Sequence, residues 1–106
     1  MTEKRLGLDE LTGKMHDFVR SKGWYEAESK RPQTPRNLSI SLALEAAEIL
    51  EHFQWNEKFE RDELADELAD VALYLLQLAS ISEIDLEKAI LKKLEVNAKR
   101  NWDNET

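Results

Sequence analysis

Residues 44–70 read LEAAEILEHFQWNEKFERDELADELAD and contain two acidic pairs at the same spacing, Glu45 with Glu48 and Glu67 with Asp70. Residues three apart lie on one face of a helix, so each pair can offer two carboxylates to a single point. If the two segments pack as antiparallel helices, the four carboxylates converge. Because hard divalent cations take oxygen ligands of this kind, the spacing predicts a site for Mg²⁺ shared by two helices.

Glu45 lies close to the apolar side of the first of these helices, roughly 60° from the centre of its apolar stripe. An isolated carboxylate in such a place is costly unless it is paired or bound to a metal. The alternative is that the pairs are ordinary surface charges of amphipathic helices, which is favoured for either pair alone but not for the two together. The expected stripes are Leu38, Leu42, Ala46, Ile49 and Phe53 in the first helix and Leu64, Leu68, Val71, Ala72, Leu75 and Ala79 in the second.

The composition is that of a globular helical protein, with 106 residues, 42% of them hydrophobic and 35% charged. This length corresponds to one domain, residues 1–106. A net charge of −7 argues against binding to a nucleic-acid polymer, which requires a basic surface, and fits either a cation site or an acidic solubilising surface. The absence of cysteine excludes disulfides and thiolate metal sites. Neither a signal peptide nor an apolar run of transmembrane length is found, so no membrane association and a cytoplasmic location are expected.

An all-α fold is predicted, because the chain has only three glycines and two prolines and few β-branched residues. Four helices are expected over residues 9–22, from 37 or 39 to 54, 61–81 and 86–100. Asp9 is the expected N-cap of the first helix and Gly23 its stop, while Ser82 or Asp85 opens the last. The expected inner faces are Leu11, Met15, Phe18 and Val19 in the first helix and Leu86, Ile90 and Leu94 in the last.

The second helix is also apolar on its far side, where Ile40, Leu44 and Ala47 lie. A helix that is apolar on most sides is buried on most sides, which in a chain of this length indicates a homodimer or homotetramer. The longest irregular stretch, from Trp24 to Arg36, combines aromatic and basic side chains. It is either a surface connection or a loop that contacts a ligand.

The last helix places Lys93, Asn97 and Arg100 at i, i+4 and i+7, which makes a polar line along one face or simply a solvated strip. Cations held between carboxylates and a polyphosphate would neutralise charge and activate a water, and basic side chains would hold the phosphates. Trp55 or Tyr74 could contact a base or sugar. There is no Gly-rich phosphate loop. A di-iron carboxylate bundle is excluded, because neither histidine follows a glutamate by three residues.

Four blocks of the chain carry a resemblance to a known family: PRNL at 35–38, LEAAEILEHFQW at 44–55, DELADV at 66–71 and KLEVNAKR at 93–100. Over roughly residues 14–102 the chain resembles the MazG-type, all-α nucleoside triphosphate pyrophosphohydrolases, and among them the dCTP-pyrophosphatase-like branch. The order of the motifs makes the likeness specific. One departure precedes the first block, where relatives often have an aromatic residue and a histidine, and this chain has Pro32, Gln33 and Thr34.

The resemblance implies a four-helix MazG-like bundle, assembled as a dimer or tetramer. It implies Mg²⁺-dependent hydrolysis, with Mn²⁺ able to substitute, of (deoxy)nucleoside triphosphates to the monophosphate and pyrophosphate. The substrate would be dCTP or a modified dCTP, and the role nucleotide-pool house-cleaning. The rival hypothesis is a non-catalytic acidic adapter that retains the fold. By position, the metal ligands and catalytic residues would be Glu45, Glu48, Glu67 and Asp70, and the substrate-binding residues Lys93, Asn97, Arg100, Trp55, Tyr74 and Asn37.

Overall fold

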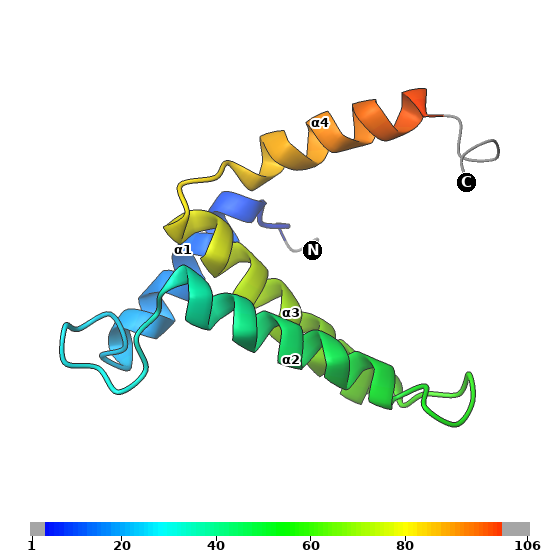
Figure 1. The fold of residues 1–106 in the computed structure, drawn as a ribbon, viewed down its shortest axis with the longest axis horizontal. Coiled ribbons are helices and arrows are strands. Elements are labelled where there is room, and N and C mark those ends of the chain that lie inside the picture. The colour runs from blue at the N-terminus through cyan, green and yellow to red at the C-terminus, as the bar shows by residue number, and fades with distance from the viewer. Residues whose placement is uncertain (1–3, 101–106) are drawn as a thin grey trace.

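The computed structural model describes residues 4–100, and within that range it consists of four helices without strands. The helices are α1 (Leu8–Ser21), α2 (Pro35–Glu51), α3 (Arg61–Ile81) and α4 (Leu86–Lys99). Figure 1 shows α2 and α3 running side by side in opposite directions, with α1 against α3. The predicted all-α class and number of helices are confirmed, and the bounds of α3 are those expected.

The helix starts differ from the prediction in two places. Gly7, not Asp9, is the N-cap of α1, and its N–H donates to Glu10 Oε1 at 3.4 Å. The second helix begins at Pro35, ahead of both expected starts. Thr34 caps it by accepting the N–H of Asn37 at 3.1 Å, and proline is well suited to the first helical position because it has no N–H to leave unpaired.

Other helix boundaries depend on capping and turns. Of the two expected starts of α4, Ser82 and Asp85, the structure has Asp85 as the cap, since Asp85 Oδ1 accepts the Lys88 N–H at 3.1 Å. The second helix ends at Glu51 rather than at residue 54. There the His52 and Phe53 N–H groups donate three residues back, which tightens the chain into a turn.

Two helices end in the same left-handed closure. After α1, Gly23 has φ +73° and the Trp24 N–H donates to the Val19 carbonyl at 3.3 Å, so the predicted glycine stop is confirmed. After α3, Glu83 takes this position with φ +59°, and the Ile84 N–H donates to the Ala79 carbonyl at 2.9 Å. A non-glycine residue is strained in this conformation, and no local sequence pattern predicted it here.

The buried apolar core is small: Met15, Val19, Leu38, Leu76 and Ala79. Four of these, all but Leu76, were expected on inner faces, but much of the predicted α3 stripe is not covered, with Leu68 51% and Leu75 41% exposed. The buried face of α3 instead includes Gln77, whose amide is hydrogen-bonded to two other side chains. A polar side chain can be buried when its hydrogen bonds are made, and periodicity of apolar residues does not reveal this.

The fourth helix projects away from the pair α2–α3 and makes its main contacts with α3 (Figure 1). The prediction that Ile90 and Leu94 face inward is wrong within one chain, where they are 43% and 60% exposed. Ile40 and Leu44 of α2 are also exposed, at 46% and 63%. The expected four-helix bundle is therefore not closed by a single chain. Between residues 4 and 100, no helix combines the length and apolar character needed to cross a membrane.

Candidate active site

An acidic cluster forms where α2 and α3 lie side by side. Glu45 of α2 and Glu67 and Asp70 of α3 each place one carboxylate oxygen within 4.8 Å of the others. The helical spacing points Glu67 and Asp70 to the same side of α3, and the antiparallel neighbour supplies Glu45. Glu48, one turn further along α2, interacts with both Glu45 and Glu67. The geometry thus brings together the two acidic pairs of residues 44–70.

Two oxygens of this cluster, Glu45 Oε2 and Glu67 Oε2, are buried and accept no hydrogen bond from any residue in the range 4–100. Burial, followed by the adjacent carboxyl groups of Glu48 and Glu45, raises the pKa of Glu67 to about 7. Burial and the neighbouring Glu48 also raise the pKa of Glu45. Oxygens that lack donors and crowd one another suit a hard divalent cation, so the residues present fit a Mg²⁺ site.

A cavity of about 580 Å³ opens beside the cluster, among α1, α2, α3 and the loop that precedes α2. Asp70 belongs to both, because it also lines the cavity wall. The loop contributes Trp24, Lys30, Arg31, Pro32 and Gln33 to the wall, so it does more than connect two helices. The guanidinium of Arg31 lies 5.4 Å from the ring centroid of Trp24, which braces the loop on this side.

A network of polar side chains joins this loop to α1 and α3. Tyr25 Oη lies 2.6 Å from His16 Nδ1, and Ser80 Oγ lies 2.7 Å from His16 Nε2. Gln77 Nε2 donates to Tyr25 Oη at 3.2 Å and to Gln33 Oε1 at 2.8 Å. Burial raises the pKa of Tyr25 and lowers that of His16. None of these interactions was predicted from the sequence, because the partners lie up to 64 residues apart and no local pattern links them.

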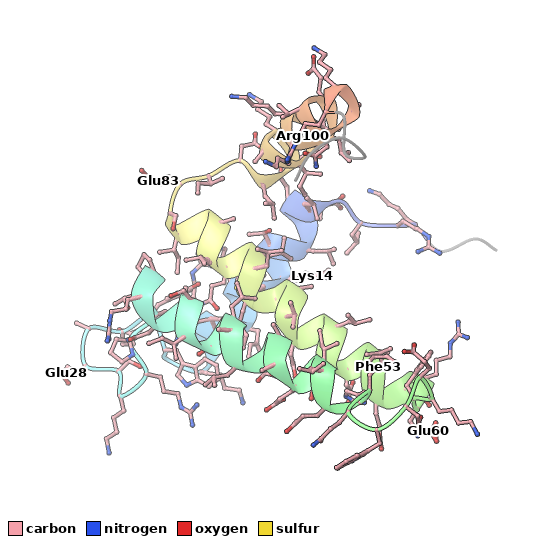
Figure 2. All side chains as sticks on the ribbon, turned by 45° about the vertical axis from the view of Figure 1, so that its right-hand side comes forward. Lys14, Glu28, Phe53, Glu60, Glu83 and Arg100 are labelled. Carbon is pink, nitrogen blue, oxygen red and sulfur yellow. The ribbon has the colours of Figure 1, made fainter. Side chains whose placement is uncertain are left out.

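A second cavity, of about 590 Å³, lies on the other side of the cluster, toward the turn between α2 and α3. Glu48 and Glu67 line it together with His52, Lys58 and Phe59. The Phe53 and Phe59 rings meet there at 5.5 Å between centroids. Figure 2 shows Phe53 and Glu60 at this end of the α2–α3 pair.

The remaining predicted substrate residues are divided between two regions. Asn37 and Tyr74 line the first cavity with Asp70. Trp55 is 85% exposed in the turn after α2 and lines neither cavity. Lys93, Asn97 and Arg100 lie on or at the end of α4, outside both cavities, and Figure 2 shows Arg100 well away from Phe53. Within one chain, the polar line of α4 is therefore not brought to the acidic cluster.

Residues 40–106 match the MazG-like family. The chain is also similar to dCTP pyrophosphatase 1 of human and of rat, with 31% and 30% identity over 103 residues. These alignments cover 88% of this chain and 58% of each relative, so the chain spans less than two thirds of the curated relatives' length.

One solved structure supports the same relationship. A pyrophosphatase from Archaeoglobus fulgidus superposes with a TM-score of 0.74 and has 32% sequence identity. The match covers 92% of this chain and 94% of that one, so the two share a fold over nearly their whole lengths.

Proposed function

The chain belongs to the MazG-like family, and we propose that it hydrolyses nucleoside triphosphates to the monophosphate and pyrophosphate with Mg²⁺, residues 1–106 acting as one domain. The observation that carries the proposal is the convergence of Glu45, Glu67 and Asp70 beside a cavity of about 580 Å³. A cavity of this size is typical of small-ligand sites. Acidic oxygens at its wall are suited to a ligand that arrives with a divalent cation, as a triphosphate does.

Each residue of the cluster has a role in this proposal. Glu45, Glu67 and Asp70 would hold the cation, with Glu48 completing the set. A divalent cation held by these residues would neutralise phosphate charge and lower the pKa of the attacking water. Asn37 and Tyr74, which line the same cavity, would contact the nucleoside.

The proposed substrate is dCTP or a modified dCTP, and the proposed role is nucleotide-pool house-cleaning. The relatives named dCTP pyrophosphatase 1 support this choice. In this chain the loop before α2 contributes Gln33 to the cavity wall. Relatives often have an aromatic residue and a histidine in this part of the loop, so the proposed base pocket would differ from theirs.

We further propose that the chain acts as a homodimer or homotetramer. Ile40 and Leu44 on α2 and Leu94 on α4 are 46%, 63% and 60% exposed in a single chain. Exposed apolar surface, such as that of Ile40 and Leu44 one turn apart on α2, usually marks an interface when it is contiguous. In such an assembly, Lys93 and Arg100 would contact the phosphates bound in a neighbouring chain's site. Trp55 would contact the nucleoside in that chain's cavity.

The test is a panel of ribo- and deoxynucleoside triphosphates incubated with Mg²⁺, with pyrophosphate and monophosphate both quantified. We expect the two products in equal amounts, and no turnover when a chelator removes the metal. Glu67→Gln should be inactive, while Glu28→Gln, at an exposed position of the loop that lines neither cavity, should behave as the parent chain. Release of orthophosphate would contradict the proposal. Absence of turnover together with no effect of Mg²⁺ on thermal stability would instead support the non-catalytic adapter.

A further inference from the structure

The hydrogen bonds along the cavity wall run in one direction, which fixes the orientation of two side-chain amides. Gln33 Nε2 donates to the Arg31 carbonyl at 2.6 Å, so the Gln33 amide presents its Oε1 on the other side. Gln77 Nε2 donates to that oxygen at 2.8 Å. If Gln33 were reversed, its oxygen would face the Arg31 carbonyl oxygen, and two acceptors would repel. The backbone of the loop therefore determines which way Gln77 points.

The second N–H of Gln77 is also used. Gln77 Nε2 donates to Tyr25 Oη at 3.2 Å, and Tyr25 Oη is 2.6 Å from His16 Nδ1. All the groups are satisfied if Tyr25 donates its proton to Nδ1, which leaves the imidazole proton on Nε2, facing Ser80 Oγ at 2.7 Å. Rotation of the Gln77 amide would break its bonds to both partners.

With both N–H groups of the Gln77 amide donating, its carbonyl oxygen is the one polar atom of the side chain still to be accounted for. Gln77 is only 3% exposed, yet it lines the first cavity. No residue within 4–100 donates a hydrogen bond to its Oε1, and this oxygen is not among the fully buried unpaired atoms. The cavity wall thus contains a fixed acceptor that still lacks a donor, and a nearly buried acceptor gains from a ligand that supplies one.

The position of this acceptor suits the base of a nucleotide. Gln77 follows Asp70 by two helical turns, which is roughly 10 Å along α3. Tyr74 lies between them and lines the same cavity. A nucleotide whose phosphates lie at the acidic cluster therefore extends its sugar and base along Tyr74 toward Gln77. Aromatic side chains stack on any base, so Tyr74 does not discriminate between bases and Gln77 can.

We propose that Gln77, oriented by Gln33, selects nucleobases that carry an exocyclic amino group. This inference rests on the proposed pyrophosphohydrolase function and specifies its substrate class. The amino group of cytosine or adenine donates to Gln77 Oε1. A base with an oxo group at the same place brings a second acceptor against that oxygen, and Gln77 is prevented from rotating to accommodate it. Sites built around a fixed polar group reject the mismatched analogue strongly.

The experiment measures kcat/KM for two matched pairs, dCTP with dUTP and dATP with dITP. Within each pair an exocyclic amino group is exchanged for an oxo group, and the adjacent ring nitrogen changes from an acceptor to an N–H donor. We expect the parent chain to prefer the amino member by at least about tenfold. Gln77→Leu removes the acceptor, and Gln33→Met frees Gln77 to rotate, so both variants should bring the ratio within each pair toward one. Glu28→Gln, in the same loop but outside the cavity, should retain the parent ratio.

The ratio separates selection from folding, since damage to the metal site or to stability lowers both members of a pair together. Turnover with a parent ratio near one, or a preference for the oxo member, overturns the inference while leaving the proposed function standing. A Gln33→Met variant that folds and keeps the full ratio also overturns it. If no triphosphate is hydrolysed, the proposed function fails. Binding of dCMP and dUMP by calorimetry then decides the inference on its own, with equal affinities overturning it.

Discussion

Glu45, Glu67 and Asp70 place three carboxylate oxygens within 4.8 Å of one another, and like charges at this separation repel unless protons or cations intervene. We predict that saturating Mg²⁺ raises the melting temperature by several degrees, because a ligand that binds only the folded state stabilises it. Asp70→Asn removes one charge, so it should raise the melting temperature without metal and reduce the response to Mg²⁺. The same substitution should lower kcat/KM by about 100-fold or more.

The measurement is thermal unfolding followed by circular dichroism, with and without Mg²⁺, on the parent chain, Asp70→Asn and the control Glu28→Gln. The control should show the parent response, because Glu28 is exposed and does not belong to the acidic cluster. Figure 2 shows it in the loop at the opposite end of the α2–α3 pair from Phe53. An equal rise in melting temperature for all three proteins would exclude Asp70 from the metal site.

The lowered pKa of His16 leads us to expect that the stability of the fold depends on pH. Burial, followed by the nearby Arg20, lowers the pKa of His16 below its ordinary 6.5. The folded state therefore binds the proton less well than the unfolded state, so the contribution of neutral His16 is fully present above pH 6.5 and is lost as the pH falls below it. We expect His16→Gln to flatten the loss of stability between about pH 7 and pH 5.

The measurement is the free energy of unfolding in urea, determined at each pH for the parent and for His16→Gln. The difference between the two proteins is then followed across the pH range. The carboxyl cluster acts in the opposite sense, because the pKa of Glu67 is raised to about 7 in the folded state and its contribution grows as the pH falls. A parent-minus-variant difference that does not change over this range would show that His16 titrates alike in the folded and unfolded chain.

At the scale of the helix, α1 and α3 end in the same hydrogen-bonded closure but with different residues at the left-handed position. Gly23 adopts φ +73° without strain, whereas Glu83 adopts φ +59° with a Cβ present. We predict that Gly23→Ala lowers the free energy of unfolding by about 1 to 2 kcal/mol. The loss would come from backbone strain, because the nearest atom to an added Cβ is Glu26 Cγ at 3.9 Å.

The reverse change, Glu83→Gly, should raise the free energy of unfolding by about 0.5 to 1 kcal/mol, since relief of strain exceeds the added entropy of glycine in the unfolded chain. Gly13→Ala is the control for the substitution itself. Gly13 is inside α1 with no atom within 4 Å of an added Cβ, so alanine should stabilise by about 1 kcal/mol there. Urea unfolding of the three variants gives the signs, and a destabilising Glu83→Gly would refute the strain argument.

At the scale of the whole molecule, the large exposed apolar surface predicts self-association. Leu44 of α2 is 63% exposed and Leu91 of α4 58%, and neither is covered by another part of the described chain. We expect light scattering to give the mass of a dimer or tetramer at micromolar concentration. Leu44→Glu should dissociate the assembly, because it places a charge in an apolar interface, and should abolish activity if neighbouring chains complete each site.

The matched control is Ser39→Glu, which adds the same charge to an already polar and exposed position of α2. It should leave the measured mass unchanged. A parent chain that is monomeric at every concentration tested would contradict the predicted assembly and would require another explanation for the exposed face of α2.

The sequence by itself determined the features that depend on local periodicity. The helical repeat defined α3 at residues 61–81 and placed Glu67 and Asp70 on one side of it. A short connection between two helices forces them antiparallel, which is why Glu45 could be expected opposite that pair. Those features depend on contacts within a few residues or across one turn, and such contacts can be predicted from local sequence patterns.

The tertiary structure decided what depends on partners far apart in the chain. The bonds of Gln77 to Tyr25 and Gln33 span 52 and 44 residues, and they bury a polar side chain on a side of α3 that lies outside the predicted apolar stripe. The direction of α4 likewise does not follow from its amphipathic pattern, since α4 contacts α3 after the turn at Glu83 and leaves Leu94 exposed. Periodicity states which face of a helix is apolar, but only the packed chain establishes which face finds a neighbour.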